Sequence, residues 1–199
     1  MNNKQHQLKL NEFCRKNNQR WKLIYSAVKH GFTAADFHHR CDGKGPTITI
    51  IKSQVGNDLF GAFTQVPWSC TRGFKKDSNA FLFTLTNPHK LPPTKFNIRE
   101  QSTDYAVYHS GYGYIGDRYD FYLFGFGGEG LSWYNFYDGN DGVRDVRRGD
   151  LFVASNCNKQ KYSSTRFPCS YTDTCGRGDS TFTESATFTV ADIELYVLE

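Results

Sequence analysis

The chain has 199 residues, 16% of them aromatic, with 18 glycines and one methionine. This length suits one domain with its own hydrophobic core, and the aromatic, glycine-rich composition favours a β-rich fold over a helical bundle. The net charge of +4 is spread along the chain without a block of like charge, which argues against nucleic-acid or membrane-surface binding, and no segment is long and apolar enough to span a bilayer.

Residues 1–18 are polar and carry a weak helical face of Leu10, Phe13 and Cys14. We interpret them as an N-terminal helical extension, followed by one domain over residues 19–199. The sequence leaves open whether this helix caps the domain or ends a longer helical region of a larger protein.

The clearest helix signals lie between residues 33 and 43. Thr33 can cap the helix with Asp36 at the third helical position, and Gly43 can take the left-handed conformation that ends it. The apolar face would consist of Ala34, Phe37, His38 and Cys41. The preceding segment, residues 21–28, fits either a helix or a strand.

Runs of β-branched and aromatic residues predict strands through the rest of the chain. Residues 47–51 and 59–64 are expected to pair as a hairpin across a turn at 55–58. Further strands are predicted at 80–85, 94–98, 119–124, 149–153 and 192–196. The polar segment 173–184 is predicted to be a mobile surface loop.

The six cysteines are expected to be free thiols in a cytoplasmic protein. Nothing at the N-terminus is typical of a secretory signal peptide, so disulfides are not favoured despite the even count. No Cys-x-x-Cys pair occurs, and the spacing of Cys169 and Cys175 does not indicate a zinc site.

Short motifs distributed along nearly the whole chain resemble the TLDc domain, the module of eukaryotic oxidation-resistance proteins. They are Trp21, Leu23-Ile24-Tyr25, His30-Gly31, Phe37-His38, Cys41-Asp42, Gly45-Pro46-Thr47, Phe60-Gly61-Ala62-Phe63, Phe81–Leu85, Asn156-Cys157-Asn158 and Asp192–Tyr196. The chain departs from the family pattern at Asp77-Ser78-Asn79, where many members have Gly-x-Gly-Glu. It also carries an elaboration of the domain at about residues 116–148.

This resemblance implies an α+β, mostly β fold: a two-sheet antiparallel β-sandwich with a few short peripheral helices. It implies a non-enzymatic regulatory module that binds a protein partner, which in several members is the vacuolar proton-pumping ATPase, and that protects against oxidative stress. An uncharacterised hydrolase or redox enzyme is the alternative, although the sequence shows no set of acid, base and nucleophile and no nucleophile-elbow motif.

Two glycine-containing segments are candidates for contact with a protein partner. Gly127, Gly128, Glu129 and Gly130 form a run in which the backbone can approach a ligand closely, but neither dinucleotide-binding nor P-loop spacing is present. Gly61 lies inside a predicted strand, where glycine marks a close backbone approach or a bulge. Tight turns and close packing explain these glycines equally well.

A calcium site is the only cofactor site that the sequence suggests. Asp138, Asn140, Asp141 and Asp145 place hard oxygen ligands close together between glycines. The EF-hand pattern fails because Gly142 sits one place early and no glutamate closes the loop. A turn rich in Asp, Asn and Gly is the competing interpretation.

Histidine and cysteine chemistry is the remaining possibility for catalysis. The adjacent His38 and His39 would point in different directions from a helix and cannot easily share a metal. We therefore expect a packed His38 and an exposed His39. Cys41 and Cys157, at positions where the family often has cysteine, are expected to be buried structural thiols rather than reactive thiolates.

Overall fold

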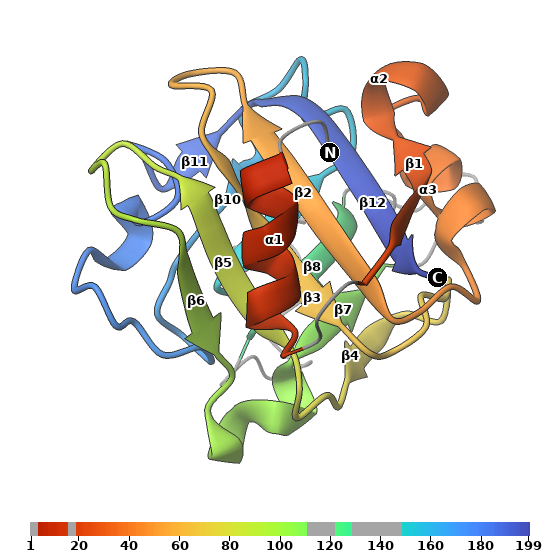
Figure 1. Cartoon of the computed structure of the whole chain (residues 1–199). Helices are drawn as coiled ribbons and strands as arrows, with labels where there is room; N and C mark the ends of the chain where they lie inside the picture. Colours follow the sequence, from red (N-terminus) through yellow and green to blue (C-terminus); the bar gives the residue numbers. More distant parts are fainter. Residues whose placement is uncertain (1–3, 16–18, 111–121, 129–148) are drawn as a thin grey trace, which may run out of the picture.

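The computed structural model describes residues 4–15, 19–110, 122–128 and 149–199. They form two antiparallel sheets of six strands each, stacked as a sandwich (Figure 1). This confirms the predicted α+β, mostly β class with short peripheral helices.

The first sheet contains strands from both ends of the chain. In spatial order it consists of β1 (Trp21–Ser26), β12 (Val190–Leu198), β2 (Thr47–Ser53), β3 (Leu59–Thr64), β5 (Phe81–Thr86) and β6 (Thr94–Asn97). The C-terminal β12 lies between β1 and β2, so neither half of the chain completes this sheet alone. The β2–β3 pairing confirms the predicted hairpin.

The second sheet is built from the middle and late parts of the chain. Its order is β11 (Thr187–Phe188), β10 (Ser163–Ser164), β9 (Leu151–Ala154), β8 (Tyr122–Phe126), β7 (Val107–His109) and β4 (Gly73–Lys75). The strand predicted within the 116–148 elaboration is β8, and it is a central strand of this sheet.

The core between the sheets consists mainly of aromatic rings. Phe37 packs edge-on against Trp68 with ring centroids 5.2 Å apart, and Phe124 lies 5.1 Å from Phe37. These three side chains come from a helix, a loop and the second sheet, and all are almost fully buried. Aromatic richness therefore reflects sheet packing, as the composition indicated.

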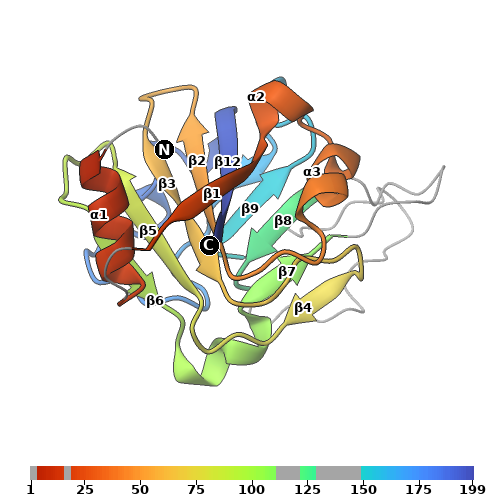
Figure 2. The ribbon, with the colours of Figure 1, turned by 45° about the vertical axis from the view of Figure 1, so that its right-hand side comes forward.

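The segment at residues 21–28 that fitted both helix and strand contains a strand and the start of a helix. It begins as β1 and continues as the single-turn helix α2 (Ala27–His30). Helix α3 (Ala34–Cys41) follows, with the predicted Thr33–Asp36 capping box and the predicted buried face. Figure 2 shows α2 and α3 side by side at one end of the sandwich. Two short 3₁₀ helices, η1 (Glu100–Tyr105) and η3 (Gly178–Ser180), lie in loops.

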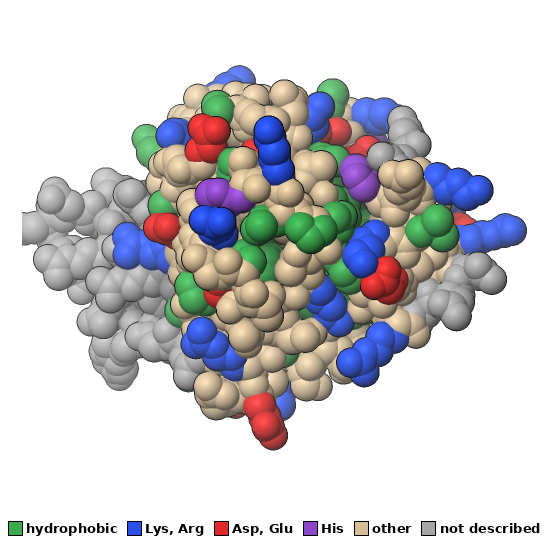
Figure 3. Space-filling view, turned by 60° about the vertical axis from the view of Figure 1, so that its left-hand side comes forward, with side chains coloured by type: hydrophobic (Ala, Val, Ile, Leu, Met, Phe, Trp, Pro, Cys, Tyr) green, Lys and Arg blue, Asp and Glu red, His purple; other side chains and the backbone are tan. Residues whose placement is uncertain are grey.

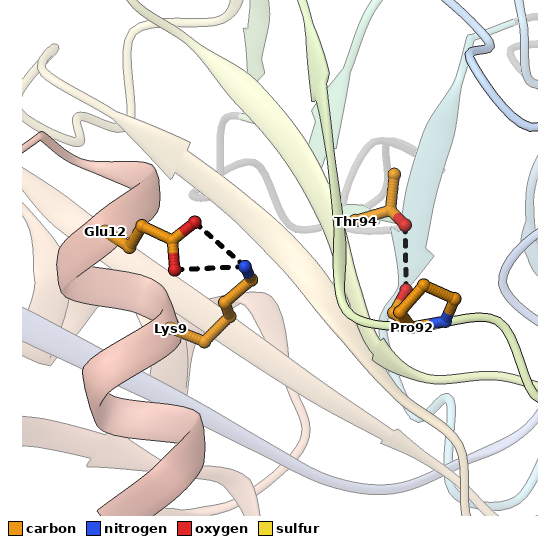
Figure 4. Close-up of polar contacts among 4 residues, drawn as sticks. All are labelled: Lys9, Glu12, Pro92 and Thr94. Carbon is orange, nitrogen blue, oxygen red and sulfur yellow. Dashed lines mark hydrogen bonds and ion pairs between the residues drawn. The ribbon is translucent and has the colours of Figure 1, made fainter.

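Helix α1 (Lys4–Phe13) covers part of the outer face of the first sheet (Figures 1 and 2). Leu10 and Phe13 are buried there against a second apolar cluster, which includes Ile48, Ile50, Phe63, Phe81, Phe83 and Leu85. On the exposed side of α1, Lys9 pairs with Glu12 at 2.9 Å (Figure 4). At the start of β6, the Thr94 hydroxyl donates to the Pro92 carbonyl at 2.7 Å (Figure 4). The predicted helical face of the N-terminal residues is therefore used for packing.

The predicted surface loop at 173–184 is more firmly anchored than its composition indicated. The Asp173 carboxylate accepts hydrogen bonds from the backbone N–H groups of Cys175, Gly176 and Gly178. Phe182 inserts into the core and is fully buried. One aromatic anchor inside a polar stretch has no periodic pattern, which is why the sequence did not reveal it.

Candidate interaction site

A buried carboxylate, Asp150, anchors the loop at residues 169–171 to the start of β9. Its oxygens accept hydrogen bonds from the backbone N–H groups of Cys169 and Ser170, both at 2.7 Å, and of Tyr171 at 3.3 Å. Burial raises the pKa of the Asp150 carboxyl to about 6, while these hydrogen bonds and Arg99 act in the opposite direction. Asp150 therefore organises loops from within the fold, and sequence reasoning did not single it out.

The Gly127-Gly128 turn lies directly against Asp150. Gly127 has φ +74°, and a Cβ at this position would overlap the Asp150 carboxylate. The Gly128 N–H donates to the Ser170 hydroxyl at 3.0 Å. The approach to Asp150 gives an internal reason for Gly127, and the positive φ of +152° gives one for Gly128. Glu129 and Gly130 lie outside the described residues.

Gly61 sits in the middle of β3, opposite Ile50 of β2. A Cβ here would overlap the Thr49 carbonyl oxygen and crowd the Phe83 ring. The sequence left open whether Gly61 marks a close backbone approach or a bulge. The structure shows the close approach, because the register shift in β3 lies earlier, between Leu59 and Phe60.

The calcium-site candidates Asp138, Asn140, Asp141 and Asp145 lie outside the described residues. Within the part of the chain that the structure describes, no three His, Cys, Asp or Glu side chains are grouped as a metal site would require. The calcium hypothesis therefore stays a prediction about residues 138–145.

The thiols with family counterparts are enclosed in the core. Cys41 and Cys157 are fully buried, as expected. Burial raises the pKa of Cys157 to about 12 and that of Cys41 well above its usual range. Since the thiolate is the reactive form, neither side chain is prepared for nucleophilic or peroxide chemistry.

Two buried histidines pack against core aromatic rings, His38 against Phe37 and His109 against Trp68. His38 is buried, with Nδ1 2.7 Å from the Asp42 carboxylate, whereas His39 is exposed, as predicted. His109 Nδ1 lies 2.9 Å from the Ser69 hydroxyl. Burial, and then the charges of Lys75 and His38, lower the pKa of His109 to about 3.

The Ser69 hydroxyl and the His109 ring form a serine–histidine contact through Nδ1. Catalytic serine–histidine pairs need a histidine basic enough to take the proton, and a third group to orient the ring. Here protonation is strongly disfavoured, and His109 Nε2 is buried with no hydrogen-bond partner among the described residues. This pair is suited to packing beside Trp68 rather than to proton transfer.

A hollow of about 310 Å³ opens between the end of α1 and the β5–β6 side of the first sheet. Its apolar walls are the rings of Phe13, Trp21, Phe63 and Phe81, and its polar walls include Gln65, Asn79, Asn97, Arg15 and Lys95. We call it the α1–β6 hollow. Sequence reasoning missed it, because its walls come from six segments that no motif connects.

Comparison with known proteins agrees with the motifs and the sandwich. The TLDc domain model matches residues 2–199. Among curated proteins, the chain is similar to the MTOR-associated protein MEAK7, with 31% identity over 65 residues in Danio rerio, 28% over 67 in Mus musculus and 30% over 66 in Gallus gallus. These alignments cover 33%, 34% and 33% of this chain, and 14% of the length of each relative. No helix in the described part of the chain could cross a membrane. With a family match across essentially its whole length and the expected two-sheet fold, this chain belongs to the TLDc domain family.

Proposed function

We propose that the chain is a non-enzymatic regulatory module that acts by binding a protein partner. The observation that carries this proposal is the TLDc match over residues 2–199. Because a fold does not determine a function, the chemistry of the described surface and interior has to support it separately.

The described residues favour binding over catalysis. The Cys41 and Cys157 thiols are buried with raised pKa values, and protonation of His109 is disfavoured. The α1–β6 hollow is lined by rings, amides and two cations, without a carboxylate among the described residues that could act as an acid or base beside them. A surface of this composition can hold a ligand but offers no paired acid and base for turnover.

The vacuolar proton-pumping ATPase is the partner that the family resemblance suggests, and protection against oxidative stress would follow from regulation of that pump. Such a role places the chain on the cytoplasmic side of the membrane. The name of the MEAK7 relatives suggests a second candidate partner, an assembly that contains the kinase mTOR.

The test measures partner binding and turnover with the same purified protein. Biolayer interferometry would compare binding of the immobilised chain to a purified soluble sector of the vacuolar ATPase and to a purified mTOR complex. Parallel assays would follow hydrogen peroxide consumption and hydrolysis of a nitrophenyl ester. Saturable binding to either assembly without turnover is expected. Turnover above a heat-denatured control, with binding to neither assembly, would overturn the proposal in favour of an enzyme.

A further inference from the structure

The α1–β6 hollow combines aromatic walls with two cationic side chains, Arg15 and Lys95. Phe63 and Phe81 stack with ring centroids 5.0 Å apart, and Phe13 meets Phe81 edge-on at 6.3 Å. Trp21 completes the apolar wall, where its indole N–H donates to Asn11 at 2.7 Å. These rings are held by packing and hydrogen bonds within the fold, so the hollow is preformed.

Both charged side chains that line the hollow are cations. Lys95 donates one hydrogen bond to the Phe13 carbonyl at 2.9 Å and lies 4.2 Å from the centre of the Phe81 ring. An ammonium group has three N–H donors, so this contact leaves donors available. Arg15, exposed just past the end of α1, forms no ion pair with any described residue.

No acidic side chain is among the described residues that line the hollow. The buried Asp77 carboxylate is committed to hydrogen bonds from the Thr64 hydroxyl and from the backbone N–H groups of Gln65 and Asn79. Glu12, the one carboxylate of α1, is already paired with Lys9 on the outer side of the helix (Figure 4). Burial, and then the charge of Arg15, lower the pKa of Lys95, which shows that the two cations act on each other. A ligand carboxylate between them would relieve this repulsion.

The size and walls of the hollow suit a peptide. Ligand pockets in proteins measure roughly 300–1,000 Å³, so about 310 Å³ accommodates one large side chain and its immediate neighbours. The Asn79 amide donates one hydrogen bond to Gln65 at 3.1 Å, and the remaining donors and acceptors of Gln65, Asn79 and Asn97 can pair with the N–H and C=O groups of a bound backbone.

A membrane surface is a poorer match for this arrangement. Membrane-binding surfaces insert protruding apolar side chains into the lipid boundary. Here the Phe13, Phe63 and Phe81 rings are recessed, and Phe81 is almost fully buried. Figure 3 shows apolar side chains gathered near the middle of one face of the molecule, with Lys and Arg side chains around them.

We propose that the α1–β6 hollow binds an acidic segment of a protein partner, which inserts one large apolar side chain and places a neighbouring carboxylate between Arg15 and Lys95. This inference rests on the proposed function, since it specifies the chemistry of the partner segment. The part-exposed Trp21 ring offers a contact surface for the apolar anchor, and the two cations select for acidic neighbours.

Selection from a random nonapeptide display library would test this directly. The full 199-residue chain is immobilised, and the recovered sequences are compared with those recovered on the Arg15→Gln variant. We expect enrichment of an aromatic or large aliphatic residue flanked by Asp or Glu. Recovery of basic or uncharged peptides, or of the same sequences in equal amounts on Arg15→Gln, would overturn the proposal.

Affinity measurements with the most enriched peptide supply the matched controls. Arg15→Gln should weaken binding by about twofold to fivefold, the range expected for loss of one partly exposed ion pair. Lys159→Gln removes the same charge from an exposed site that does not line the hollow, and it should bind like the unmodified chain. Equal weakening by both variants would mean a general charge effect and would refute the site. Lys95→Gln should weaken binding further, but it also removes a contact to α1, so the decision rests on Arg15→Gln.

Two further measurements separate this inference from the proposed function. If Arg15→Gln binds the vacuolar ATPase sector as tightly as the unmodified chain does, the proposed regulatory function is retained, and the hollow is not the docking site for that partner. If acidic peptides bind but neither assembly does, the hollow stands and the proposed partners fail. If no acidic peptides are selected and the chain binds phosphatidylserine vesicles, and if Arg15→Gln abolishes that binding, the ligand of the hollow is a membrane surface and the peptide proposal is wrong.

Discussion

Replacing Gly127 by alanine tests whether this glycine is required by the interior of the fold. Its backbone φ is +74°, nearly the same as the +72° of Gly43. The two sites differ in their surroundings: an added Cβ would overlap the Asp150 carboxylate at Gly127, whereas it would meet nothing within 4 Å at Gly43. Gly43→Ala therefore isolates backbone strain, and Gly127→Ala adds displacement of a buried carboxylate.

The expected magnitudes follow from these differences. A non-glycine residue in the left-handed region costs about 1 kcal/mol of folding free energy, which applies to both variants. Moving Asp150 weakens at least one of its hydrogen bonds from Cys169, Ser170 and Tyr171, and a hydrogen bond to a charged group contributes about 1.5–3 kcal/mol. We expect Gly127→Ala to lose about 3 kcal/mol and Gly43→Ala about 1 kcal/mol.

Urea denaturation followed by tryptophan fluorescence measures both free energies of unfolding. The informative quantity is the difference between the two variants, which should be about 2 kcal/mol. Losses that agree within about 0.5 kcal/mol would refute the close approach to Asp150. In that case, a selective loss of partner binding in Gly127→Ala would support direct contact between this turn and a ligand.

The remaining predictions concern pH, capping, thiols and calcium. The folded-state pKa of His109 is about 3, below the unfolded value of about 6.5, so its contribution to stability is complete above pH 6.5 and is lost as the pH falls. Relative to His109→Asn, the free energy of unfolding of the unmodified chain should decrease by about 1.4 kcal/mol per pH unit below about pH 6, and parallel pH profiles would contradict this. Thr33→Ala removes the hydrogen bond that the Thr33 hydroxyl accepts from the Asp36 N–H and the one that it donates to the Asp36 carboxylate. This should cost about 1 kcal/mol, or about 2–4 °C in Tm; an unchanged Tm would show that α3 does not depend on its cap. Cys157 is buried and should react with Ellman's reagent only after unfolding, so Cys157→Ser should leave oxidant protection unchanged; rapid labelling of this thiol in the folded chain would reopen a redox mechanism. If residues 138–145 bind calcium, millimolar Ca²⁺ should raise the Tm and Asp141→Asn should abolish the shift, whereas an unchanged Tm would remove the calcium hypothesis.

Local features were predicted well because their causes are local. The α3 capping box depends on Thr33 and Asp36, which are three residues apart, and its buried face follows from helical spacing. The β2–β3 hairpin follows from two β-branched and aromatic runs on either side of a turn. Trp21 to Val28 stayed ambiguous until its pairing partner was known, because β1 is a strand only by virtue of β12, which is about 170 residues away in sequence.

The candidate sites were predicted less completely. The sequence indicated the glycines at 61, 127 and 128 but did not reveal that Thr49 and Asp150 lie against them. A cavity depends on which side chains converge from distant segments, and the α1–β6 hollow combines residues from α1, β3, β6 and the loops beside them. Neither periodicity nor a motif encodes such a convergence.

By itself, the sequence determined the β-rich class, the caps of α3, the β2–β3 hairpin and the family, because each depends on residue types at short, regular spacings. Only the tertiary structure decided that both chain ends complete one sheet, that Asp150 is buried behind a glycine turn, and that Arg15 and Lys95 share an aromatic hollow. These features depend on distances between residues far apart in the chain, and packing of the two sheets sets those distances.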